Sequence, residues 1–173
     1  MPADDLTLRR TLKSSDRPEI ALILQGVRVF RAEEVAIGLE LVDESLAPTA
    51  STDYRWVIAE RSGKVVGFAC FGPVPLTEGT YDLYWIAVAS AEHGSGIATR
   101  LDAEVTESVR AIGGRWLLAE TSSTEVYART HRFYEKHGYQ RLERLPDFYR
   151  IGDDRLIFGK RMDGAGTVST NRQ

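Results

Sequence analysis

The chain has 173 residues, enough for one domain with a single core and too few for two. Its 43% hydrophobic and 27% charged residues are typical of a soluble globular protein, and a net charge of -3 leaves no basic stripe for nucleic acid. No apolar run reaches the roughly 20 residues of a membrane helix, no signal-peptide stretch opens the chain, and the single cysteine, Cys70, excludes an internal disulfide. We therefore expect a cytoplasmic protein that binds a small molecule.

The first part of the chain predicts a strand followed by two helices. Residues 6–12 alternate weakly between apolar and polar side chains, which indicates a short strand. A helix is expected from Arg17, with Asp16 as its cap and Pro18 in its first turn. A second helix is expected over residues 33–46.

A meander of three strands is expected next. Residues 54–60 and 65–71 are mainly apolar and are joined by a tight turn, which predicts an antiparallel hairpin. The third strand, at 80–88, is apolar on both faces and should lie in the middle of the sheet. Strict alternation would place the side chains of Leu83 and Trp85 on the same face.

The most regular helix pattern covers residues 97–112. Its apolar residues recur at spacings of three and four and form one stripe, and Gly113 should stop the helix. A strand, a helix and two strands follow, at 116–120, 124–137, 139–145 and 155–161. The order of elements predicts an α/β fold with a mixed sheet and helices on its faces. We expect one domain over residues 1–162 and a flexible tail over 163–173, which is rich in Gly, Ser and Thr.

Residues 85–101 (WIAVASAEHGSGIATRL) run from an apolar strand through a loop with two close glycines into a helix. Such a loop suits a phosphate group, because the N–H groups at a helix N-terminus attract anions. A nucleotide P-loop needs Lys-Ser/Thr after the second glycine, where this chain has Ile97 and Ala98. A dinucleotide-binding turn is weakly supported, because Thr99 replaces its third glycine and an antiparallel meander precedes it. The remaining candidate is the pyrophosphate of coenzyme A.

Two segments resemble markers of the GNAT acetyltransferase superfamily. Residues 88–98 are similar to its coenzyme A loop, with the core Gln/Arg-x-x-Gly-x-Gly/Ala, although His93 stands at the Gln/Arg position. Residues 133–139 (FYEKHGY) are similar to a helix that carries Phe-Tyr and ends in Gly-Phe or Gly-Tyr. With the element order, the resemblance covers residues 6–162. It implies the GNAT fold, a mostly antiparallel sheet with a parallel central pair, and acetyl-CoA as cofactor.

The resemblance also implies which residues bind acetyl-CoA. The strand before the loop would bind the pantetheine arm through its backbone, and the loop would bind the pyrophosphate. Tyr127 stands where family members commonly have Asn. Tyr134 falls at the position that in many members protonates the departing thiolate, which suits a phenol with an ordinary pKa of about 10. The cofactor-binding residues implied are Ile86, Ala87, Val88, His93, Gly94, Ser95, Gly96, Ile97, Ala98, Thr99, Tyr127 and Tyr134.

Two carboxylates are candidates for the general base. Asp82 lies near the start of the strand at 80–88, and Glu120 ends the strand at 116–120. Either would accept a proton from an amine, and a chain of ordered waters is the alternative in this superfamily. With Tyr134, these residues complete the catalytic candidates. No metal is expected, because the histidines have no ligand spacing and no Cys/His cluster exists.

The expected function is acetyl-CoA-dependent N-acetylation of a small amine, of amino-acid or polyamine type, by direct attack in a ternary complex. Acidic residues at 33–44 suit a cationic acceptor, and five aromatic residues suggest a compact pocket for it: Tyr81, Tyr84, Trp85, Phe148 and Tyr149. The alternatives are a catalytically weak coenzyme A-binding module and an acetyltransferase of protein N-termini or lysines. A homodimer is left open.

Overall fold

The computed structural model describes residues 5–162, so the tail expected over 163–173 lies outside the described residues. The strands are β1 (Thr7–Arg9), β2 (Arg55–Arg61), β3 (Lys64–Pro73), β4 (Thr80–Val88), β5 (Trp116–Ser122), β6 (Gln140–Arg150) and β7 (Asp153–Arg161). The helices are α1 (Arg17–Gly26), α2 (Ala32–Leu46), α3 (Ile97–Ala111) and α4 (Ala128–Lys136). Short 3-10 turns are η1 (Ser14–Asp16), η2 (Ser90–Glu92) and η3 (Glu125–Tyr127). This order of strands and helices is the one expected.

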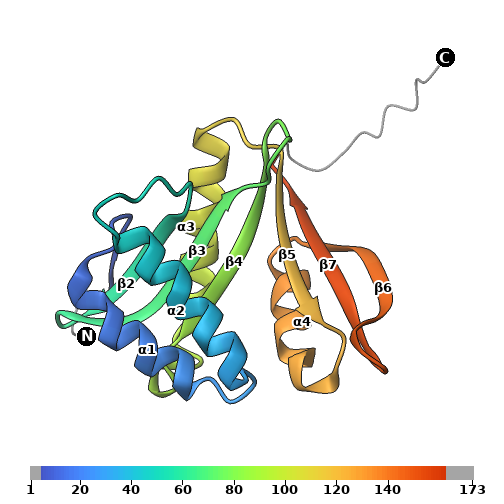
Figure 1. The fold of residues 1–173 in the computed structure, drawn as a ribbon, viewed down its shortest axis with the longest axis horizontal. Helices are drawn as coiled ribbons and strands as arrows, with labels where there is room; N and C mark the ends of the chain where they lie inside the picture. The colour runs from blue at the N-terminus through green and yellow to red at the C-terminus, as the bar shows by residue number, and fades with distance from the viewer. Residues whose placement is uncertain (1–4, 163–173) are drawn as a thin grey trace.

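Within residues 5–162 the seven strands form one sheet in the order β1-β2-β3-β4-β5-β7-β6. Every neighbouring pair is antiparallel except β4 and β5, which are parallel. Figure 1 shows these two strands close together at one end and separating toward the other. The predicted α/β class, with a mostly antiparallel sheet and a parallel central pair, is confirmed.

Helices pack on both faces of this sheet (Figure 1). On one face α1 and α2 enclose a core with β2, β3 and β4, in which Leu24 and Val42 are fully buried. On the other face α3 and α4 pack around a second core that includes Leu101 and Phe158. Each such side chain contributes about 1.5–3 kcal/mol on burial. No helix in the described part of the chain has the length and apolar character required to cross a membrane.

The regular pattern of α3 is confirmed, with one correction at its end. Leu101, Val105 and Val109 are fully buried on the sheet. Ile112, expected as the last residue of the stripe, is 41% exposed, because α3 ends at Ala111 and the chain then turns away through Gly113, whose φ is +76°. A left-handed φ of this kind is readily adopted by glycine.

The expectation that Leu83 and Trp85 share a face is wrong. The pairing of β3 with β4 contains a β-bulge. Cys70 and Phe71 of β3 are consecutive, but their partners on β4 are Trp85 and Leu83, so Tyr84 is the extra residue and has no Cα partner in the ladder. Because the extra residue shifts the alternation of side chains, Leu83 packs in the core of α3 while Trp85 packs in the core of α1 and α2.

Strand β6 is longer than expected. It runs to Arg150, whereas the sequence pattern indicates an end at residue 145. The pairing with β7 is irregular between Leu145 and Arg150, because Pro146 has no N–H to donate and Asp147 has a φ of +52°. The strand resumes after this irregularity and brings the turn between β6 and β7 toward β5.

Candidate functional site

A cleft opens where β4 and β5 separate. The two strands pair only over Thr80–Asp82 and Trp116–Leu118, so both have unpaired backbone edges beyond this point. The cleft has a volume of about 1560 Å³ and is lined by β4, β5, α2, α4, the first turn of α3, the α1–α2 loop and the β6–β7 turn. Both halves of the sheet therefore form its walls.

The loop before α3 presents backbone N–H groups to this cleft. Gly94 and Gly96 have φ of +85° and +82°, and α3 starts without a side-chain cap. The N–H groups of a first helical turn have no partners within the helix, and the helix dipole is positive there. Ile97, Ala98 and Thr99 of this turn line the cleft. The arrangement fits a pyrophosphate, as expected for coenzyme A.

The side chains of this loop contact the protein itself. His93 lines the cleft, and its Nε2 donates to the Val88 carbonyl at 3.1 Å, so that carbonyl is already used. Ser95 does not line the cleft: its hydroxyl donates to the Glu92 carbonyl at 2.6 Å, and its backbone N–H donates to the same oxygen at 3.2 Å. Glu92 pairs with Arg61. The groups of this loop that suit an anion are therefore its backbone N–H groups rather than its polar side chains.

Tyr134 of α4 belongs to the second core and also lines the cleft. Its side chain is 5% exposed, and its ring centroid lies 5.0 Å from that of Tyr139 and 5.4 Å from that of Phe158. Burial, and secondarily the Asp102 carboxylate, raise the pKa of Tyr134 well above its ordinary value. Phe133, at the next position, is only partly buried. Both residues line the cleft.

A buried charged cluster lies behind Tyr134 and was missed in the sequence. Lys160 Nζ donates to Asp102 Oδ2 at 2.6 Å and to Thr106 Oγ1 at 2.9 Å. The Tyr139 hydroxyl donates to Asp102 Oδ1 at 2.7 Å. The cluster joins α3 to β7 and to the segment after α4, and so holds the tyrosine pair in place. The available signal was the position of Lys160 in β7, in phase with Leu156 and Phe158, which are buried. A lysine on a buried face is rare without a partner.

Two carboxylates lie near the end of the cleft where β4 and β5 converge. Asp82 belongs to the last β4–β5 pair, and Glu120 lies beyond that pair on β5. Glu120 accepts a hydrogen bond from the Tyr149 hydroxyl at 2.7 Å and lies 3.9 Å from Arg155. Asp82 is half-buried, and burial followed by the nearby Glu120 charge raises its pKa. Asp82 is therefore suited to accept and hold a proton.

The raised pKa of Asp82 makes a prediction about stability. Asp82→Asn is expected to raise Tm at pH 8 by about 1–3 °C, because the ionised carboxylate is less favourable in the folded protein than in the unfolded chain. The gain should shrink as the pH falls toward about 4, the ordinary pKa of Asp, where the carboxyl group becomes protonated in both states. Thermal unfolding of both proteins across this range tests it. A gain in Tm that does not change with pH would contradict the raised pKa of Asp82.

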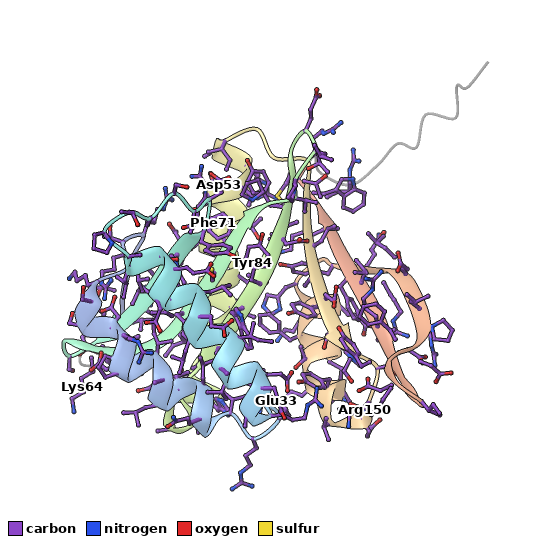
Figure 2. All side chains as sticks on the ribbon, in the orientation of Figure 1. Glu33, Asp53, Lys64, Phe71, Tyr84 and Arg150 are labelled. Atoms are coloured by element: carbon purple, nitrogen blue, oxygen red, sulfur yellow. The ribbon has the colours of Figure 1, made fainter. Side chains whose placement is uncertain are left out.

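Aromatic side chains line the cleft on the α1–α2 side. Phe30 of the α1–α2 loop meets Trp85 edge-on, with ring centroids 5.0 Å apart, and Tyr84 meets Tyr54 at 5.5 Å. Tyr84, Trp85, Phe30 and Tyr149 line the cleft, whereas Tyr81 packs against the core of α3 and Phe148 stacks on Arg155. Figure 2 shows Tyr84 on the sheet, with Glu33 and Arg150 toward the end where β4 and β5 diverge.

Tyr127 connects the two sides of the cleft. Its hydroxyl donates to Glu34 Oε1 at 2.9 Å and lies 3.4 Å from the Val29 carbonyl. Burial and the hydrogen bond to Glu34 raise the pKa of Tyr127. Of the cationic residues on α4, Arg129 and Lys136 line the cleft. The role of Glu34 was missed, because an acidic helix face usually indicates solvent exposure.

Comparisons with known proteins agree on one family. Residues 52–141 match the model of the acetyltransferase (GNAT) domain. A protein of Desulfovibrio desulfuricans assigned to the GNAT family of acetyltransferases is 43% identical, with a TM-score of 0.88 over 91% of this chain and 99% of that one. The ribosomal-protein-S18-alanine N-acetyltransferase of Escherichia coli is 18% identical, with a TM-score of 0.72 over 94% and 97%. An aminoglycoside 6'-N-acetyltransferase complexed with coenzyme A is 19% identical, with a TM-score of 0.71 over 93% and 99%. No curated protein matches the chain.

Proposed function

Because the chain belongs to the GNAT acetyltransferase family and uses acetyl-CoA, we propose that it N-acetylates a small cationic amine within its single domain. The observation that carries this proposal is the Asp82–Glu120 pair at the converging end of a cleft that Tyr84 and Trp85 also line. Two negative groups beside aromatic faces attract a cation. Acidic and aromatic lining of this kind fits an ammonium group better than it fits an anionic or purely apolar acceptor.

The cofactor-binding roles follow from the backbone. The first turn of α3, with Gly94 and Gly96, would bind the pyrophosphate through N–H groups. The unpaired edge of β4 at Ile86 and Ala87 would bind the pantetheine arm in the manner of an added strand. Bound in this way, acetyl-CoA supplies the acetyl group as a thioester at the end of the cleft near Asp82.

Asp82 would accept the proton that the ammonium group must lose before its nitrogen can attack. Because its pKa is raised, the proton affinity of Asp82 is closer to that of an amine than the proton affinity of an ordinary carboxylate is. Glu120 is held by Tyr149 and lies near Arg155, so it would act as a fixed negative charge that orients the acceptor.

Tyr134 would hold a proton for the departing sulfur. As the C–N bond forms and the C–S bond breaks, its phenol proton passes to the thiolate, and the phenolate is then reprotonated from solvent or from the amine's released proton. Burial raises the pKa of a thiol as well as that of a phenol, as it does for Cys70. In a cleft that excludes water, the pKa of the departing thiol would therefore rise in the same direction as that of Tyr134.

A small acceptor is favoured over a protein chain by the contacts that span and border the cleft. The Tyr127–Glu34 hydrogen bond joins its two sides, and the β6–β7 turn contributes Arg150 and Ile151 to its wall. A folded protein could present an N-terminus or a lysine only through the remaining opening. The aminoglycoside and ribosomal-protein enzymes have this fold with very different acceptors, so these local residues decide the preference.

An acceptor panel tests the function. The enzyme is incubated with acetyl-CoA and with amino acids, polyamines, aminoglycosides or peptides bearing N-terminal alanine or internal lysine, and thiol release and acceptor mass are measured. We expect kcat/KM at least tenfold higher, about 1.4 kcal/mol, for the best small cationic amine than for any peptide. A preference for peptides would overturn the small-molecule assignment. Acetyl-CoA binding without transfer to any amine would identify a binding module instead.

A further inference from the structure

Thr121 of β5 stands out among the residues that line the cleft. Its side chain is 93% buried, since 7% of its surface is exposed, and its hydroxyl has no hydrogen-bond partner in the described part of the chain. The next residue is fully engaged by contrast: the Ser122 hydroxyl contacts Thr124 Oγ1 and Asp153 Oδ1, and the Ser122 carbonyl accepts from His131. Buried hydroxyls are normally paired, so an unpaired one in the wall of a binding cleft indicates a missing partner.

The position of Thr121 determines what that partner can be. The β4–β5 pairing ends at Leu118, so Thr121 lies beyond it, where the strands have separated. The turn at Ile97, which is proposed to bind the phosphates, belongs to α3 and lines the same cleft. A ligand with its phosphates at this turn and its thioester toward the converging end of β4 and β5 would pass Thr121 with a group that lies between the two.

Tyr127, one of several residues of the cleft lining that carry a hydroxyl, does not compete for this partner. Its hydroxyl already donates to Glu34. Within residues 5–162 the Thr121 hydroxyl makes no hydrogen bond. It can therefore turn toward a ligand by rotation about χ1 without breaking one. A hydroxyl can both donate and accept, which suits an amide with its N–H and C=O groups.

We propose that the Thr121 hydroxyl positions acetyl-CoA by hydrogen bonding to an amide of its pantetheine arm. This proposal rests on acetyl-CoA use and is independent of the identity of the acceptor. It assigns to a side chain of β5 a contact that complements the backbone contacts expected from β4.

Calorimetric titration of Thr121→Val with two ligands tests the proposal. Coenzyme A carries the pantetheine arm, whereas adenosine 3',5'-bisphosphate has the nucleotide part alone. Valine keeps the shape of threonine and removes the hydroxyl. The Kd for coenzyme A should rise about 3–10-fold, as expected for one hydrogen bond, while the Kd for adenosine 3',5'-bisphosphate stays unchanged. Thr121→Ser, which keeps the hydroxyl, should bind coenzyme A nearly as well as the wild type.

A matched control is Ser108→Ala. Ser108 of α3 also has a buried hydroxyl, with no hydrogen-bond partner among residues 5–162, but it does not line the cleft. Its loss should therefore leave both Kd values unchanged. Without ligand, Thr121→Val should have the same Tm as the wild type or a higher one, because it removes an unpaired buried polar group. An unchanged Kd for coenzyme A, or an equal rise for both ligands, would overturn the proposal and leave the proposed acetyl transfer intact.

Discussion

Tyr134→Phe should lower kcat by roughly 10²–10⁴-fold, the range typical of a lost general acid, with little change in KM for acetyl-CoA. Phenylalanine keeps the ring and its contacts with Tyr139 and Phe158, so the variant loses only the hydroxyl. A proton donated to the departing sulfur acts mainly in the transition state, and its loss therefore affects kcat more than binding. Initial rates of thiol release with the best amine of the panel measure the effect.

Tyr139→Phe is the matched control for this variant. Tyr139 is also buried and touches Tyr134, but its hydroxyl donates to Asp102 and it does not line the cleft. Its loss should lower Tm and leave kcat within about threefold, a change of less than 1 kcal/mol. Burial raises the pKa of Tyr134, so its phenol should stay protonated through the alkaline assay range. Ionisation of Tyr134 should therefore cause no fall in the wild-type rate at high pH. Near-normal kcat for Tyr134→Phe would reduce Tyr134 to a packing residue.

Gly96→Val should weaken acetyl-CoA binding at least tenfold, about 1.4 kcal/mol. Gly96 has a φ of +82° directly before α3, a conformation that a β-branched residue adopts only with strain. Relief of that strain would reorient the N–H groups of the first helical turn. The position of a Cβ on Gly96 meets no atom within 4 Å, so the substitution leaves the surrounding protein contacts in place and its effect should concentrate on ligand binding.

Gly63→Val separates backbone strain from ligand binding. Gly63 has a φ of +76° in the turn between β2 and β3, and its Cβ would also meet nothing within 4 Å. Both valine variants should lose a similar amount of stability, read as Tm, whereas only Gly96→Val should raise the Kd for acetyl-CoA. Equal Kd values for Gly96→Val and wild type, in folded protein, would remove the loop from the binding site.

The elements with strong periodicity were predictable from the sequence, because a regular pattern reflects burial on one face. The apolar spacing of α3 and the glycines around it indicated both the helix and the loop. The faces of β4 were not predictable, because the bulge that reorients Trp85 arises from the pairing with Cys70, a residue remote in sequence. The end of β6 was misplaced for a similar reason, since Pro146 interrupts the pattern without ending the strand.

Side-chain roles in the site were harder to predict than the elements that hold them. The loop residues of the motif were found, yet Ser95 turns back to Glu92 and His93 bonds to Val88. Glu34 meets Tyr127 across 93 residues of sequence, and no local pattern reveals a partner at that separation. Asp82 and Glu120, chosen as candidates from the ends of their strands, do lie near each other, because parallel pairing places these two strand segments side by side.

The most direct test of the whole account is the rate of thiol release at crossed concentrations of acetyl-CoA and the best small amine of the panel. Direct transfer between two substrates held in one cleft predicts intersecting lines in the double-reciprocal plot, with one acetylated amine formed for each thiol released. Parallel lines would instead indicate an acetyl-enzyme intermediate and contradict direct attack. Thiol release that no amine raises above the rate with acetyl-CoA alone would contradict the proposed N-acetyltransferase itself.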